Sequence, residues 1–311
     1  MRNDNTPSLT AWFVAVAILV LGSDEYGISS CPPGSIDAQR RVLLAAGFRK
    51  QHLSVWGKQC LRGFLHHVVH RHCLEGLGRR KLYMEHAVRS FLAPTISTAT
   101  TSNIITTKRQ VLIVAAGYDT LAMRLAPDYT HSSVTFWEVD HPATSKRKQK
   151  AMEFELTSNG QIHCIMADLA TIQLSTILRQ QHEHQERPQY DLTSPTIVIV
   201  EGLTMYLTGN QIFDFFRDVA TVVGPGSRIC FDHFGWKNGT FDNGWSTPCQ
   251  RHFAKRIGEE WHWGIDPNDL QDFLVDTPWT IIDQSAKMGL EYMATVELTK
   301  AINSLPAIDG G

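Results

Sequence analysis

The sequence has little net charge and nothing that marks a fibrous or disordered protein. Its 311 residues include 29 Lys and Arg against 31 Asp and Glu, a formal net charge of −2. A nearly neutral chain lacks the basic surface that attracts nucleic acid or an anionic membrane, so we predict neither partner. Hydrophobic residues make up 43% and charged residues 19%, which excludes collagen, coiled coil and wholesale disorder.

The six cysteines are scattered and contain no C-x-x-C pair. A chain of this length is too large for a small disulfide scaffold, so we expect reduced, buried thiols in a cytoplasmic protein. At about 100–200 residues per domain, the length permits one large α/β domain or two smaller ones.

The longest apolar run, AWFVAVAILVL at residues 11–21, is about half as long as the ~20 residues that span a bilayer. Its length also suits the core of a signal peptide, with a cleavage site near residues 20–22. Because Arg2 and Asp4 leave little positive charge before the run, we favour a buried N-terminal helix over secretion.

The chain changes character near residue 110. Residues 37–92 favour helices, and a Ser/Thr-rich loop follows at 94–109. Beyond it we predict strands at 110–115, 134–139, 161–166, 196–200 and 228–231, and helices at 120–126, 142–155, 169–181 and 209–223. Continuous apolar runs between helices predict a parallel sheet covered on both faces. The prediction is an α/β fold with a helical N-terminal cover (1–109), a core (110–311) and an aromatic-rich insertion at about 236–265.

In an open α/β sheet, ligands bind outside the carboxyl ends of the strands, so the residues that close each run are candidates. The first run ends in a small-residue turn with Ala115 and Gly117. This turn lets the backbone approach a ligand, although it also suits a plain strand–helix connection. It is not G-x-G-x-x-G, so the dinucleotide fingerprint is absent.

Carboxylates close the next three runs. Asp140 is placed to accept hydrogen bonds from ribose hydroxyls or to cap a helix, while Glu138, two residues earlier, is expected to pair within the fold. Asp168 with Leu169 suits an adenine amine and ring, or again a helix cap. Glu201 directly ends an apolar strand, where a carboxylate without a partner is costly to bury.

Five segments together resemble a known family. QVLIVAAGYDT, FWEVDHP, ADL and IVIVEGLTMYL occur in the order and spacing seen in the leucine carboxyl methyltransferase-like family, and GRRKLYMEHAVRSFL extends the likeness upstream. The resemblance covers about residues 37–233 and is poor in the C-terminal third. It implies a Rossmann-like class I methyltransferase sheet that binds S-adenosyl-L-methionine.

The resemblance also implies roles for individual residues. It places the turn at 115–117 under the cofactor, and it assigns Arg80 to the methionine carboxylate, Arg40 to a basic position that is often Lys, Asp140 to the ribose, Asp168 and Leu169 to the adenine, and Glu201 to the amino group. Two residues depart from the family pattern. Ala115 stands where the family usually has Gly, and Arg40 is not interchangeable with Lys at a tight site.

The acceptor determines which catalytic residues are needed. A carboxylate is already ionised at neutral pH and needs only positioning, whereas a hydroxyl needs a general base. His233, at the end of the fifth run, is a candidate base, although a core histidine fits the same position. Tyr206 is a candidate for the acceptor pocket or for plain packing, and residues 236–263 suit a lid or an acceptor wall.

A metal site is not predicted. His66 and His70 have the i, i+4 spacing of a zinc pair, but no catalytic acid lies between them and the resemblance implies no metal.

The leading expectation is O-methylation of a small molecule, at a carboxylate or a hydroxyl. The alternatives are methylation of a protein C-terminal leucine, and a pseudo-methyltransferase that uses the fold for binding or for a cyclisation or rearrangement. The oligomeric state stays open.

Overall fold

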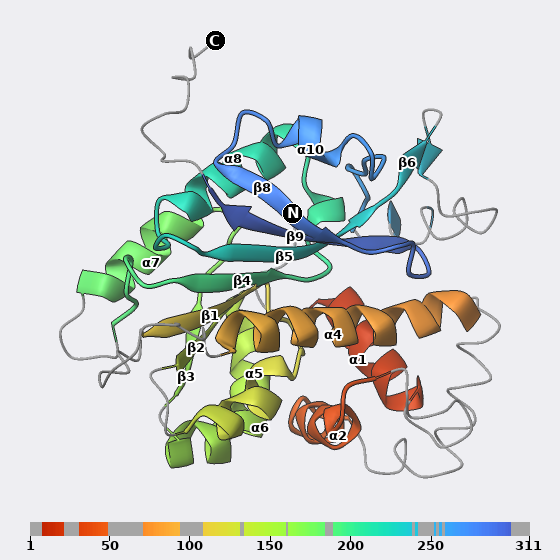
Figure 1. Cartoon of the computed structure of the whole chain (residues 1–311). Coiled ribbons are helices and arrows are strands. Elements are labelled where there is room, and N and C mark those ends of the chain that lie inside the picture. The colour runs from red at the N-terminus through yellow and green to blue at the C-terminus, as the bar shows by residue number, and fades with distance from the viewer. Residues whose placement is uncertain are drawn as a thin grey trace.

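A seven-stranded sheet with helices on both faces forms the centre of the molecule (Figure 1). The structure is a computed structural model that describes residues 8–21, 31–48, 71–93, 108–130, 134–159, 161–183, 189–237, 240–241, 252, 255–256 and 259–299.

The strand order is β3-β2-β1-β4-β5-β9-β8. The parallel strands are β1 (Arg109–Val114), β2 (Val134–Asp140), β3 (Ile162–Met166), β4 (Thr196–Val200) and β5 (Arg228–Phe234), and β9 (Glu291–Leu298) pairs antiparallel with both β5 and β8 (Trp279–Gln284). All five predicted strands are confirmed, and β5 runs on to Phe234. These five strands are parallel, as predicted, and β9 extends the sheet in the opposite direction beside β5.

Helices cover the sheet in two groups. One face carries α1 (Leu9–Leu21), α2 (Ser35–Ala45), α4 (Arg71–Leu92), α5 (Leu121–Leu125) with the 3₁₀ turn η4 (Ala126–Tyr129), and α6 (Pro142–Asn159); the other carries α7 (Leu174–Glu183), α8 (Gly209–Ala220) and α10 (Leu270–Phe273). A 3₁₀ turn, η5 (Thr204–Tyr206), follows β4, and a small hairpin of β6 (Trp236–Lys237) and β7 (Thr240–Phe241) follows β5. The α/β class is therefore confirmed.

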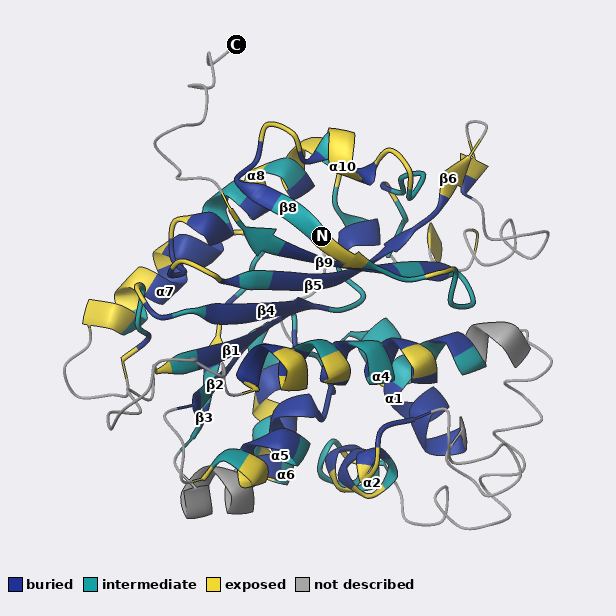
Figure 2. Ribbon diagram, in the orientation of Figure 1, coloured by how far each residue is buried: buried dark blue, intermediate teal, exposed yellow. Residues whose placement is uncertain are grey.

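The two faces of the sheet bury separate apolar clusters. Val111 and Ile113 of β1 pack with the helices of the first group, while Leu112 and Val114 pack with those of the second. Side chains alternate along a strand, so a strand covered on both faces is apolar at every position. The central strands are accordingly buried along nearly their whole length (Figure 2).

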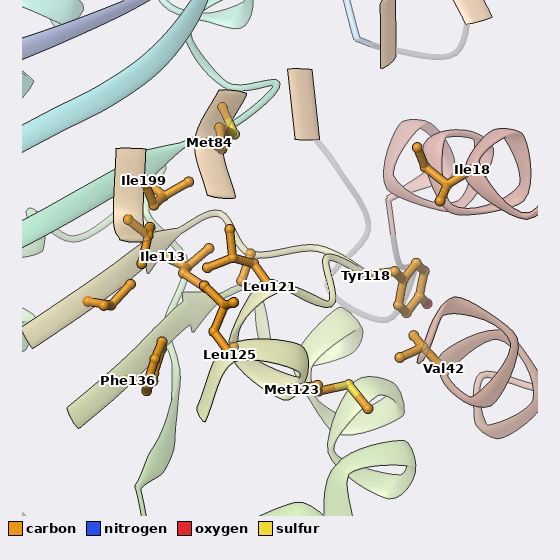
Figure 3. Packing of buried hydrophobic residues seen from close by; sticks show 14 of the residues in the cluster. Ile18, Val42, Met84, Ile113, Tyr118, Leu121, Met123, Leu125, Phe136 and Ile199 are labelled. Carbon is orange, nitrogen blue, oxygen red and sulfur yellow. The ribbon is translucent and has the colours of Figure 1, made fainter. Parts of the chain in front are cut away.

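The apolar run at the start of the chain forms the buried helix α1, as predicted. Ile18 and Leu19 are at most 2% exposed, and α1 packs against α2 and α4. Tyr118, in the loop after β1, extends toward these helices and lies close to Val42 of α2 (Figure 3). None of the described helices is long and apolar enough to span a membrane.

Among the helix boundaries that differ from the prediction, the start of α7 and the end of α8 differ by three residues or more. Helix α7 begins at Leu174 rather than 169, because the Asp168 carboxylate and carbonyl accept hydrogen bonds from residues 170–172 and form a turn there. Helix α8 begins with a capping box of Thr208 and Gln211 and ends at Ala220, three residues before the predicted end.

Candidate functional site

The candidate site lies where the strand order changes direction. β1 pairs with β2 on one side and with β4 on the other, so the helices after β1 and β4 leave to opposite faces. Such a switch point opens a crevice outside the carboxyl ends of the strands, where α/β proteins bind ligands. The loop from Ala115 to Gly117 and the side chain of Glu201 lie at this edge.

The loop after β1 has an unusual backbone conformation. Ala115 has a φ of 53° and Gly117 a φ of 50°. Left-handed backbone costs an alanine about 1–2 kcal/mol, whereas glycine adopts it freely. The structure thus gives a physical reason why a glycine would suit position 115.

Asp140 closes β2 beside this loop. Its carboxylate accepts hydrogen bonds from the backbone N–H groups of Gly117 and His141. Each carboxylate oxygen can accept more than one hydrogen bond, so Asp140 can hold the loop and still accept from a ligand hydroxyl. Glu138 behaves as predicted, because its buried carboxylate pairs within the fold with Lys148 at 2.8 Å.

Arg80 of α4 is buried among three carboxylates from three strands. Its Nε donates to Glu201 Oε1 at 3.0 Å, and its Nη1 donates to Asp232 Oδ2 at 2.8 Å and Glu291 Oε1 at 2.7 Å. The guanidinium is 3% exposed. A planar guanidinium can hold several carboxylates in fixed directions, as this arrangement requires.

Lys81 extends the cluster. Its Nζ donates to Asp119 Oδ1 and to Glu201 Oε2, both at 2.6 Å, and the other oxygen of Asp119 is buried without a hydrogen bond in the described part of the chain. The cluster of Arg80, Lys81, Asp119, Glu201, Asp232 and Glu291 therefore sets two cations against four acids. With every group ionised, it has two excess negative charges.

Proton affinities in this cluster are shifted in opposite directions. Burial alone would raise the pKa of Asp119, but the charges of Lys81 and Lys148 outweigh burial and hold that pKa below its ordinary value. Burial raises the pKa of Glu291 to about 7, although Arg80 opposes the shift. Burial likewise raises the pKa of Asp232. The two acids with raised pKa values, Asp232 and Glu291, are thus the ones that pair with Arg80 and not with Lys81.

Of the other predicted ligand residues, two lie at the same edge of the sheet and one does not join the cluster. Asp168 and Leu169 follow β3, where Asp168 Oδ1 accepts from the Ala170 N–H at 3.0 Å and Leu169 is half-buried. Arg40 is 41% exposed on α2 and pairs with Asp37 at 3.3 Å. No hydrogen bond or ion pair among the described residues joins it to Arg80 or to the loop after β1.

Tyr206 lies in η5, near both the cluster and the N-terminal helix. Burial and the charge of Glu259 raise the pKa of the Tyr206 phenol above its ordinary value, and a hydrogen bond with Thr10 opposes the shift. Ser8 donates to Glu259 Oε1 at 3.2 Å. The start of α1 therefore contacts the residues expected on the acceptor side.

His233 is on the opposite face of the sheet from Arg80. Neighbouring strand residues point to opposite faces; Asp232 contacts Arg80, whereas His233 stacks on Tyr292 with ring centroids 5.6 Å apart. It is fully buried, and burial lowers its pKa to about 4. His233 is therefore a neutral ring in an aromatic core at ordinary pH.

The predicted absence of a metal site is tested only in part. Within the residues that the structure describes, no group of three or more His, Cys, Asp or Glu side chains could hold a metal ion. His66 and His70 lie outside those residues.

Four cluster members were not identified from the sequence: Lys81, Asp119, Asp232 and Glu291. The first three had a usable signal, since Lys81 follows Arg80, Asp119 lies in the turn after β1 and Asp232 precedes His233. Glu291 had none, because the strand that carries it was not predicted.

Comparison with known proteins finds a match to one family. Residues 68–220 match the family described as leucine carboxyl methyltransferase. The matched segment is just under half of the chain. The matched residues contain Arg80, Lys81, Asp119, Asp140 and Glu201, and so include most of the charged cluster and the loop after β1.

Two curated relatives of this chain have names of the same kind. A provisionally named S-adenosyl-L-methionine-dependent methyltransferase of Mycobacterium marinum is 30% identical over 186 residues, 56% of this chain and 55% of the relative. YktD of Bacillus subtilis, with the same provisional name, is 28% identical over 134 residues, 42% of this chain and 40% of the relative. The chain therefore spans about half the length of the curated relatives it matches.

A solved structure has the same fold. The crystal structure of a provisionally named methyltransferase from Thermobifida fusca superposes with a TM-score of 0.51 at 14% identity, covering 88% of this chain and 96% of that one. The likeness supports the class I methyltransferase sheet that the sequence predicted.

Proposed function

We propose that this protein binds S-adenosyl-L-methionine at the carboxyl edge of β1, β2 and β4 and transfers its methyl group to an oxygen of a small molecule. The family match and the names of the relatives support the cofactor and the type of reaction. The single observation that carries the proposal is the buried cluster around Arg80, in which four acids outnumber two cations.

The charge of this cluster suits the cofactor. S-adenosyl-L-methionine has an ammonium and a sulfonium against one carboxylate, so it would bring positive charge to a buried site that lacks it. In this proposal Arg80 holds the methionine carboxylate. Glu201 faces the ammonium, Asp140 accepts from the ribose hydroxyls, and Asp168 with Leu169 receives the adenine.

The proposed acceptor is a carboxylate. When bound, the cofactor supplies an electrophilic methyl group on sulfur, and an ionised carboxylate can attack it without a base. The buried position of His233, on the face away from Arg80, supports an acceptor that needs none. Tyr206, with its raised pKa, remains a phenol that can donate a hydrogen bond to an acceptor oxygen.

Mass spectrometry of candidate acceptors tests this proposal. The protein is incubated with S-adenosyl-L-methionine and pooled small carboxylic acids, phenols and alcohols, and products heavier by one methyl group are identified. We expect the acids to be methylated. Mild base should remove the added methyl group from them, because esters hydrolyse under these conditions and aryl ethers do not. Methylation confined to phenols or alcohols would contradict the proposed acceptor class.

A second candidate function is ligand binding without methyl transfer. It is favoured by Ala115, whose left-handed φ of 53° places a Cβ on the loop proposed to lie under the cofactor. The two functions differ in a simple observation. A methyltransferase converts the cofactor to S-adenosylhomocysteine when an acceptor is present, whereas a binding protein leaves it intact with every acceptor offered.

A further inference from the structure

Glu291 is the one acid of the Arg80 cluster that comes from the antiparallel strand β9. It is the first residue of β9 and 7% exposed. Its Oε1 accepts from Arg80 Nη1 at 2.7 Å. Nη1 also donates to Asp232 Oδ2 at 2.8 Å, so two carboxylates share one nitrogen.

The acids on Arg80 are held unequally. Asp232 is fully buried, and its second oxygen accepts from the Gly202 N–H at 2.8 Å. Glu201 is held by Lys81 as well as by Arg80. Among the described residues, Glu291 has a side-chain hydrogen bond only with Arg80. It is therefore the carboxylate that another carboxylate can replace with the fewest broken contacts.

We propose that Glu291 occupies Arg80 in the cofactor-free protein, and that the cofactor's carboxylate displaces it while Glu291 takes a proton from solvent. This inference rests on the proposed function, because it assumes that Arg80 binds the carboxylate of the cofactor. The exchange conserves the contacts of Arg80. One carboxylate replaces another on the guanidinium, and one proton moves from water to Glu291.

The surroundings of Glu291 explain why its carboxylate would take up a proton when it leaves Arg80. The titratable groups that face it are Arg80 of α4, Glu201 after β4, Tyr206 in η5 and Asp232 of β5. Without Arg80, Glu291 would lie beside two other carboxylates in a buried site, where an unpaired negative charge is costly. Its pKa of about 7 with Arg80 in place agrees with a group that is easily protonated.

The proposal fixes the sign of the pH dependence. Below the pKa of free Glu291 the side chain is already neutral and competes little for Arg80. Above it, the ionised carboxylate must be displaced and protonated, so affinity falls as pH rises. Linkage to one proton gives a fall of up to about tenfold per pH unit.

Calorimetric titration with S-adenosylhomocysteine, which retains the amino-acid end, tests the exchange. Titrations from about pH 6 to about pH 8, each in two buffers of different ionisation enthalpy, give both the affinity and the protons taken up. The test variant is Glu291→Gln, which keeps the shape but cannot ionise. The matched control is Glu297→Gln on the same strand, where Glu297 pairs with Arg228 at the surface.

We expect the natural protein and Glu297→Gln to take up a proton on binding and to lose affinity above pH 7. Glu291→Gln should bind with nearly constant affinity and no proton uptake over the same range, after the same correction for the ligand's own amino group. Binding by the natural protein without proton uptake, or equal pH profiles for it and Glu291→Gln, would overturn the exchange alone. Absence of binding at every pH would contradict the proposed function instead.

Discussion

Arg80 of α4 and Glu201 at the end of β4 are 121 positions apart in the chain, yet Arg80 Nε donates to Glu201 Oε1 at 3.0 Å. This contact joins the N-terminal helices to the switch point of the sheet. The helical cover therefore contributes to the candidate site, and we predict that substitutions in α4 affect ligand binding as well as stability.

Arg80→Lys should weaken binding of S-adenosylhomocysteine by tenfold to about a hundredfold. Lysine keeps the positive charge but loses the planar donor set that reaches Glu201, Asp232 and a ligand carboxylate together. Titration calorimetry measures the change. Arg79→Lys, at the exposed neighbouring position on α4, is the matched control and should bind as the natural protein does. Similar affinities for both variants would remove Arg80 from the proposed site.

Ala115→Gly should stabilise the protein by up to about 1 kcal/mol. Glycine relieves the left-handed strain at a φ of 53°. We expect this gain in folding free energy to exceed the loss that comes from the greater conformational entropy of glycine in the unfolded chain. Thermal unfolding measures the change in Tm. The control is Ala116→Gly, one residue later at a buried position without a positive φ, which should be destabilising. A Tm for Ala115→Gly below that of the natural protein would contradict the claim that Ala115 is strained.

Gly117→Ala should destabilise the protein by about 2 kcal/mol or more. A Cβ at this position would meet a φ of 50° and lie 3.1 Å from the Cβ of Ala11, so strain and crowding add. Gly226→Ala has a similar φ but open space around the new Cβ, and should cost less. Adding Ala11→Gly to the Gly117→Ala variant should recover part of the lost stability, which urea unfolding measures. No recovery would mean that α1 does not crowd this loop.

His233→Phe should reduce the sensitivity of the protein to acid. Burial lowers the pKa of His233 from 6.5 to about 4, so the unfolded chain binds a proton that the folded chain excludes. The stability contributed by the neutral ring is complete above about pH 6.5 and is lost as pH falls, by about 1.5 kcal/mol between pH 6.5 and 5. Urea unfolding at several pH values should show this slope only in the natural protein.

The same variant tests the choice of acceptor. Phenylalanine preserves the stacking on Tyr292 and removes both ring nitrogens: Nε2 has no hydrogen bond among the described residues, and Nδ1 lies 3.3 Å from the carbonyl oxygen of Phe234. Methyl transfer to a carboxylate should continue at a similar rate. Loss of transfer by a variant that folds normally would instead assign His233 a catalytic role.

The sequence predicted the parts of the fold that depend on local patterns. Five apolar runs became β1 to β5 because strands buried on both faces leave no polar positions. The partners of Arg80 were harder to predict, since a cluster drawn from three strands and a helix depends on tertiary packing. Glu291 lies on a strand that inserts antiparallel beside β5, and no pattern near residue 291 indicated that neighbour.

The central claim is that the edge carrying Arg80 and Asp140 binds S-adenosyl-L-methionine. Its most direct test is calorimetric titration of the natural protein and of Asp140→Ala with S-adenosylhomocysteine at about pH 6.5. We predict saturable one-to-one binding by the natural protein and at least about tenfold weaker binding by the variant, which loses an acceptor for ribose hydroxyls. No binding by the natural protein at about 1 mM ligand, or equal affinity for both proteins, would contradict the claim.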